Sequence, residues 1–337
     1  MAADLQNRIF VGTGDPGTVY LIKDGSEAVE LFKSPELYIQ SLAADKHGNL
    51  YAGTVPRGII YKIDSTGETT VFCSLPSPYI WDMSVDNNSN LFAATGNEGI
   101  LFKISPDGIP VVFFDSPETN LLDVLIDRYD NVYVGTEPNG LVYKITPSGQ
   151  AQVLYDANEG EIHCLSMDSM GNIYAGTASG AQAQVPMSPI PQPPVQTGIT
   201  ASVFKEGKSW DLNLPEELPM SQSASMQQQK TISKAIEATP KTTGFPTAPN
   251  YIYTITQDGL TQKIMETSQA FILGMSLDTQ DNLYVVTGNT SGVFKVSGDE
   301  SSSSLARVEE VQALCCLNTS NDELYFGTGN VGKVYKI

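Results

Sequence analysis

The sequence has no apolar run long enough to cross a bilayer. Its first ten residues, MAADLQNRIF, lack the basic and then apolar organisation of a secretory signal. We therefore expect a soluble chain with no membrane partner. Its compartment stays open between the cytoplasm and an extracytoplasmic space reached after a leader is removed.

Positive charge is scarce. Nineteen Lys and Arg residues stand against 38 Asp and Glu residues, which gives a net charge of -19. Such a surface repels phosphate backbones and anionic lipids, so we expect no nucleic-acid partner. The excess of acid serves either solubility or a surface for cations and basic ligands, and the sequence leaves both readings open.

Cysteine and histidine are also rare. The four cysteines, at Cys73, Cys164, Cys315 and Cys316, include no CxxC pair, and their spacing matches no metal knuckle. One aspartate recurs in most repeats, but the segments after it lack the length and closing glutamate of a calcium loop. We interpret these aspartates as turn formers and expect neither a metal nor a cofactor.

A seven-residue motif recurs along the chain. GNLYAGT ends at Thr54, and related segments end at the other positions of a 41-residue period: Thr13, Thr95, Thr136, Thr177, Thr287 and Thr328. The gap from Thr177 to Thr287 equals one period plus a 69-residue insertion. An aromatic residue stands three positions before each threonine: Phe10, Tyr51, Phe92, Tyr133, Tyr174, Tyr284 and Tyr325. The chain therefore contains seven units.

Each unit has room for four short strands separated by Asp, Asn, Gly and Pro turns, and none shows helical periodicity. This pattern predicts an all-β, seven-bladed β-propeller with four-stranded antiparallel blades. We expect a single propeller domain over residues 1–337, with units starting at 1, 42, 83, 124, 165, 275 and 316. The recurrent aromatic residues then pack between blades.

The last unit ends directly after its third strand, so we expect the final blade to lack its own fourth strand. An exposed strand edge is a template for further pairing. A partner strand or a further domain is therefore expected at the edge near Ile337.

The insertion covers residues 178–250 and is rich in Pro, Ser, Gln and Thr. Such a composition buries too little apolar surface to order itself independently. We expect a largely flexible excursion from the fifth blade, on the side of the propeller where ligands usually bind.

The residues just before each innermost strand are expected to line the channel mouth. Their second position is apolar, whereas the first, third and fourth positions vary from blade to blade. The candidate ligand-binding residues drawn from these positions are Tyr38, Tyr79, Trp81, Asp82, Asp123, Glu161 and His163. Aromatic rings beside carboxylates suit a sugar, a peptide or a cationic group.

No catalytic residue is assigned. His163 and Cys164 are neighbours on one strand, so their side chains point to opposite faces and form no dyad. His47 lies in a polar turn, DKHGN.

Units of the form D..GNLYAGT...GIIYKI resemble the repeats of bacterial seven-bladed propellers in the broad neighbourhood of the NHL, quinoprotein-like and sensor-type families. The resemblance covers the chain apart from the insertion. Those families include sensors, scaffolds, lectins, lyases and lactonases, and this sequence lacks their family-specific signatures, so no catalytic residue carries over.

We expect a non-enzymatic binding or scaffold propeller that engages a protein, peptide or glycan at its rim. The alternative is a lactonase- or lyase-type enzyme in which Asp82, Asp123, Glu161 and His163 converge on the channel.

Overall fold

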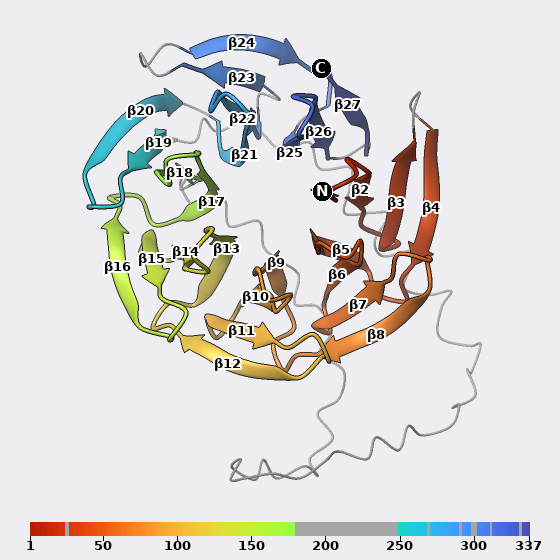
Figure 1. The fold of residues 1–337 in the computed structure, drawn as a ribbon. Coiled ribbons are helices and arrows are strands. Elements are labelled where there is room, and N and C mark those ends of the chain that lie inside the picture. Colours follow the sequence, from red (N-terminus) through yellow and green to blue (C-terminus); the bar gives the residue numbers. More distant parts are fainter. Residues whose placement is uncertain are drawn as a thin grey trace, which may run out of the picture. The chain divides into compact units, whose positions relative to one another are not determined.

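The computed structural model describes residues 1–23, 27–178, 249–267, 270–289, 292–297, 302–310, 312–329 and 332–337. All lie in one unit formed by Met1–Gln182 and Thr247–Ile337. In the described part the strands form six four-stranded sheets and one three-stranded sheet, in sequential antiparallel order. The sheets of this unit lie around a common centre (Figure 1). The predicted all-β, seven-bladed propeller is thus confirmed, including a last blade with three strands.

Each blade runs from the centre outwards in chain order. The innermost strands are β1 (Ala2–Ala3), β5 (Tyr38–Ala44), β9 (Ile80–Val85), β13 (Asn120–Ile126), β17 (Ile162–Met167), β21 (Ile272–Leu277) and β25 (Ala313–Asn318). The second strands are β2 (Ile9–Gly12), β6 (Leu50–Val55), β10 (Leu91–Thr95), β14 (Val132–Glu137), β18 (Ile173–Thr177), β22 (Leu283–Thr287) and β26 (Leu324–Thr328). The third strands are β3 (Thr18–Lys23), β7 (Ile59–Ile63), β11 (Ile100–Ile104), β15 (Leu141–Ile145), β19 (Asn250–Ile255), β23 (Gly292–Val296) and β27 (Val334–Lys336). The outermost strands are β4 (Glu27–Lys33), β8 (Thr69–Ser74), β12 (Pro110–Asp115), β16 (Ala151–Asp156), β20 (Thr261–Thr267) and β24 (Ser302–Arg307).

The repeated motif forms the second strand, and both faces of that strand are buried. All five residues of β10 are buried, with no alternation of apolar and polar positions. Each apolar core cluster joins two neighbouring blades: Tyr51 and Ile60 of the second blade, for example, share a cluster with Ile80 and Phe102 of the third. A blade therefore completes its core only against its neighbours.

The recurrent aspartates form turns at one end of the blades. Asp45 Oδ1 accepts hydrogen bonds from the backbone N–H groups of His47 (2.8 Å) and Asn49 (2.9 Å). Its Oδ2 accepts from Asn49 Nδ2 (2.7 Å) and the Tyr51 hydroxyl (3.3 Å). In the described residues, no group of three or more His, Cys, Asp and Glu side chains is placed to hold a metal ion.

Because consecutive strands are antiparallel, the two ends of the blades carry different connections. The end with these aspartate turns also carries the turns between third and fourth strands, and we call it the lower rim. The opposite end, the upper rim, carries the starts of the innermost strands, the turns between second and third strands, and the connections between blades. The candidate residues all lie at the upper rim.

The first and seventh blades meet without exchanging a strand. Ser320, in the last blade, donates from its backbone N–H (3.2 Å) and its hydroxyl (2.9 Å) to Asn7 Oδ1 of the first blade. The outer edge of β27 faces away from its sheet partner β26. A partner strand at this edge stays a prediction.

The expected flexibility of the insertion falls almost wholly on residues 179–248, which lie outside the described residues. Among the residues that are described, no helix has the length and apolarity to span a membrane.

The packing between blades gives a first prediction. Tyr133 is completely buried in the core between the fourth and fifth blades. Truncation of a buried aromatic side chain leaves a cavity, so we expect Tyr133→Ala to lower the free energy of unfolding by about 3–5 kcal/mol. Denaturant titration followed by circular dichroism measures this change.

Two controls separate packing from other effects. Tyr133→Phe removes only the hydroxyl, which lies 3.2 Å from Asp127 Oδ2, and should cost about 1 kcal/mol. Tyr129, which is 66% exposed, should tolerate alanine within about 0.5 kcal/mol. Equal effects of Tyr133→Ala and Tyr129→Ala would contradict the packing between blades.

Candidate functional site

A β-bulge sits near the start of six innermost strands. In the second blade, Ile39 pairs with Thr54 and Ser41 pairs with Gly53, so Gln40 is skipped by the ladder. The same shift occurs in the next five blades. The bulged residues are Gln40, Trp81, Leu122, His163, Leu273 and Leu314. A bulge re-aims the side chain that it frees, so one residue per blade is released from the sheet at the upper rim.

Three bulged side chains lie over a glycine that follows the motif threonine. A Cβ at Gly96 would collide with the Trp81 indole, one at Gly288 with Leu273, and one at Gly329 would press on Leu314. Glycine at these positions therefore makes room for the re-aimed side chain. Leu314 remains 43% exposed.

Trp81 forms the centre of an aromatic platform. Its ring stacks on Tyr79, with the ring centroids 5.5 Å apart and the planes 7° from parallel. The indole Nε1 donates to Asn120 Oδ1 (3.4 Å), and Asn120 Nδ2 donates to Glu137 Oε2 (2.9 Å). Asn120 also accepts from the backbone N–H of Asn97 (3.1 Å). This network fixes the orientation of the platform across the third and fourth blades.

Asp82 and Asp123 form a carboxyl pair between consecutive innermost strands. Asp82 Oδ2 accepts from the backbone N–H of Val124 (3.1 Å), and Asp123 Oδ2 accepts from that of Leu165 (2.6 Å). Burial, and then the neighbouring Asp123 carboxylate, raise the pKa of Asp82 well above its ordinary value. Burial also raises the pKa of Asp123, while the hydrogen bond from Asp82 and the charge of His163 oppose that rise. These directions favour a proton shared between the two carboxyl groups in the folded chain.

His163 pairs with Glu161 rather than with its sequence neighbour. The His163 Nδ1 atom lies 2.7 Å from Glu161 Oε1, and both side chains are partly buried. The Cys164 thiol points instead towards the Ile272 carbonyl, at 3.7 Å, in the next blade. Burial raises the pKa of the Cys164 thiol well above its ordinary value, so Cys164 is a poor nucleophile.

Other carboxylates at the upper rim hold the blades together. Glu36, 4% exposed, forms a bidentate pair with Arg57, whose Nε lies 2.9 Å from both carboxylate oxygens. Glu118, 5% exposed, occupies the equivalent place two blades further and accepts from Asn139 Nδ2 (3.0 Å). These two glutamates anchor the turn of the following blade and are structural.

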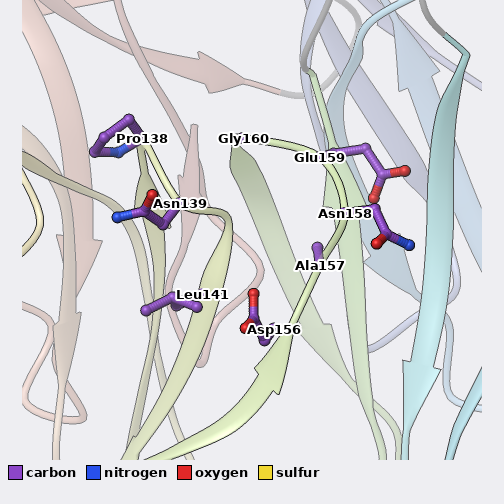
Figure 2. A pocket seen from close by; sticks show the side chains of 8 residues that line it. All are labelled: Pro138, Asn139, Leu141, Asp156, Ala157, Asn158, Glu159 and Gly160. Atoms are coloured by element: carbon purple, nitrogen blue, oxygen red, sulfur yellow. The ribbon is translucent and has the colours of Figure 1, made fainter.

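An open pocket of about 500 Å³ lies on the upper rim beside the fourth blade. Its lining comes from the turn after β14 and from the connection between β16 and β17 (Figure 2). The lining residues are Pro138, Asn139, Leu141, Asp156, Ala157, Asn158, Glu159 and Gly160. The last lining residue, Gly160, directly precedes Glu161 of the His163–Glu161 pair in the sequence.

The structure brings most of the nominated residues into three pairs: Tyr79 with Trp81, Asp82 with Asp123, and Glu161 with His163. The seventh, Tyr38, is 45% exposed, lies in the second blade and bridges to Gly14 of the first. Sequence reasoning omitted Gln40, Leu122, Leu273 and Leu314, which occupy the same bulge position as Trp81 and His163. These residues all stand at the third position of the four-residue segment that begins each innermost strand, so nominating that position in every blade would have included them.

This arrangement can bind and can move protons. The stacked platform offers an aromatic surface, and the exposed leucine offers an apolar one. The carboxyl pair and the His163–Glu161 pair are groups that can give or take a proton. The aromatic and apolar surfaces thus suit binding, and the two pairs suit acid–base chemistry.

No protein-family model matches the sequence, and no curated protein matches it. Among solved structures, the chain is similar to a streptogramin B lyase, with a TM-score of 0.69 at 11% identity over 100% of this chain and 92% of the lyase. It is also similar to the WD40 β-propeller domain of Doa1, with a TM-score of 0.62 at 8% identity over 98% of this chain and 88% of that domain. A chain of a nidogen/laminin complex gives a TM-score of 0.57 at 12% identity over 91% of this chain and 96% of that chain. At these identities the likeness shows the propeller fold alone.

The carboxyl pair predicts a pH dependence of stability. The folded chain keeps a proton on Asp82 that the unfolded chain releases above about pH 4, because the folded-state pKa of Asp82 is raised. The stability linked to this proton is lost as the pH rises through the folded-state pKa. We therefore expect the melting temperature of the wild type to fall more steeply than that of Asp82→Asn as the pH rises above the ordinary pKa of Asp, about 4.

In the Asp82→Asn variant, the side-chain amide can still accept a hydrogen bond from the backbone N–H of Val124 and donate one to the Asp123 carboxylate. Unlike the carboxyl group, it has no proton to lose in this pH range. Asp107→Asn makes the same change of charge in an exposed lower-rim turn and should follow the wild-type curve. Parallel melting curves for the wild type and Asp82→Asn would show that the pair does not share a proton.

Proposed function

We propose that this protein is a non-enzymatic binding propeller that engages a peptide segment of a protein partner at its upper rim. One observation carries the proposal. Each bulge turns a single side chain out of the ladder, and these side chains are not the same around the ring: three are leucines, and the others are Gln40, Trp81 and His163. A repeated scaffold thereby presents an asymmetric surface, which is what recognition of one extended segment requires.

The chemistry of this surface supports a peptide ligand. Leu37, Tyr38 and Leu314 are 47%, 45% and 43% exposed, and Trp81 forms a rigid stacked platform beside polar groups. Aromatic anchors with a polar surround are typical of protein-binding surfaces. Among the structural neighbours, one comes from a complex of nidogen with laminin.

Selection from a displayed library of random twelve-residue peptides tests the proposal. We expect peptides that bind the wild type with micromolar dissociation constants and lose at least about tenfold in affinity against Trp81→Ala, since aromatic anchors carry much of the binding energy. Fluorescence anisotropy of labelled peptides measures the change.

Tyr129→Ala is the matched control, because it removes an exposed aromatic ring from the lower rim. Melting curves establish that both variants are folded. Peptides whose affinity is unchanged by Trp81→Ala, or reduced equally by Tyr129→Ala, would refute recognition at the upper rim.

A second candidate function is favoured by the two proton-carrying pairs. A raised pKa of Asp82 beside Asp123, with a His–Glu pair on the next blade, is a pattern found at acid–base sites. The streptogramin B lyase among the structural neighbours shows that propellers also serve enzymes. This candidate is a lyase- or lactonase-type enzyme.

Incubation with a streptogramin B antibiotic and with a γ-lactone, followed by mass spectrometry, tests this second candidate. An enzyme of this type should convert one of them, and His163→Ala should lower the rate by about a hundredfold or more, as removal of a general acid or base does. Asp107→Asn, which changes an exposed carboxylate of the lower rim, should leave the rate unchanged. A lack of conversion above the buffer rate would leave the binding function as the better account.

A further inference from the structure

Building on the proposed binding function, we infer that the peptide segment recognised at the upper rim is basic, with a Lys or Arg side chain seated on the Tyr79–Trp81 platform. The inference rests on the proposed function, and the two can fail separately: peptides selected by display can depend on Trp81 and still carry no Lys or Arg.

One part of the upper rim contains acidic residues but no Lys or Arg. We call residues 96–99, 115–120, 137–140 and 156–161 the acidic sector; they form the turns and connections of the third and fourth blades up to the fifth. These segments contain no Lys or Arg. They contain the acidic residues Glu98, Asp115, Glu118, Glu137, Asp156, Glu159 and Glu161.

Neutral donors, rather than cations, contact three of these carboxylates. Glu118 is bound by Asn139, Glu137 by Asn120, and Glu159 Oε2 by the Tyr253 hydroxyl at 3.0 Å. Glu161 is the exception, since it pairs with His163. Hydrogen bonds from neutral groups orient a carboxylate and leave its charge in place, so the sector keeps a negative potential.

In the part of the chain that the structure describes, the basic residues lie outside the acidic sector. Five third-strand lysines lie over an aromatic ring of the second strand in their own blade, within 6.0 Å of its centroid: Lys62, Lys103, Lys144, Lys295 and Lys336. On the upper rim, Arg57 pairs with Glu36, and Lys333 pairs with Glu310. Lys33 and Arg307 end strands of the first and sixth blades, outside the acidic sector.

The platform lies within this sector. Trp81 is joined through Asn120 to Glu137, and Asn97 of the same sector donates to the same amide oxygen. An ammonium or guanidinium group over an indole ring is attracted by the ring quadrupole, and a nearby carboxylate adds to that attraction. The fixed stacking of Tyr79 on Trp81 lowers the entropic cost of binding.

Charge complementarity selects the occupant. A basic segment gains from the field of the sector and of the chain as a whole, which carries a net charge of -19. An acidic segment is repelled, and a neutral glycan would use the platform without needing the carboxylates. The experiment therefore compares ligands that differ only in charge.

The test uses the whole chain with Trp210→Phe, which leaves Trp81 as the single tryptophan reporter. Acetyl-hexalysine amide is titrated against it at low salt, with acetyl-hexaglutamine amide as the uncharged match. We expect saturable change of the Trp81 fluorescence with hexalysine and none with hexaglutamine. Added salt should weaken binding.

Two triple variants separate the sector from general attraction. Glu98→Gln with Glu137→Gln and Glu161→Gln removes three charges from the sector. Glu68→Gln with Asp107→Asn and Asp258→Asn removes three charges from exposed turns of the lower rim. By calorimetry we expect the first triple variant to bind hexalysine about tenfold more weakly and the second to change affinity less than twofold.

Equal weakening in the two triple variants would overturn the inference, as would an absence of hexalysine binding or full binding by Trp81→Ala. Peptides from the display experiment give the remaining distinction. If they depend on Trp81 but carry no Lys or Arg, the inference fails and the binding function stands. If they do not depend on Trp81, both fail.

Discussion

The structure depends on apolar packing between neighbouring sheets. Second strands such as β10 bury both faces, and the Tyr133 side chain is fully enclosed between two blades. A single blade has no such enclosure, because its apolar faces would meet water. The repeat period, the motif and the aspartate turns all serve this constraint: they keep each sheet in the register that its neighbours require.

The same constraint separates positions that carry the fold from positions that can carry a site. At the start of each innermost strand the second position is core, as Ile80 is. The third is released by a bulge, as Trp81 and His163 are. The fourth lies between blades, where Asp82 contacts the backbone of the fourth blade. Variation at the third position therefore changes the surface without disturbing the core.

The carboxylates of the upper rim fall into three physical classes. Glu36 is neutralised by Arg57 and holds a turn in place. Asp82 and Asp123, both partly buried, have raised pKa values because their carboxyl groups are desolvated beside each other, which favours a shared proton. The acidic sector keeps its charge where its partners are amides and hydroxyls, as at Glu118, Glu137 and Glu159. Only this last class offers an outside ligand a long-range attraction, and its segments contact the aromatic platform at Asn120.

The fold could be predicted from the sequence because the units repeat with a strict period. Each unit has an aromatic residue at the same place, such as Tyr51 or Tyr133, and these are residues that pack between blades. Pairing of Asp82 with Asp123 could not be predicted, since it depends on how two strands 41 residues apart approach each other. Nor could the bulge, which arises from the ladder and not from residue type. Sequence by itself determined the seven sheets and their turns, because each follows from short-range pattern and period. Tertiary structure alone decided which variable side chains leave the ladder, share a proton or surround Trp81, because those outcomes require the blades to close around an axis.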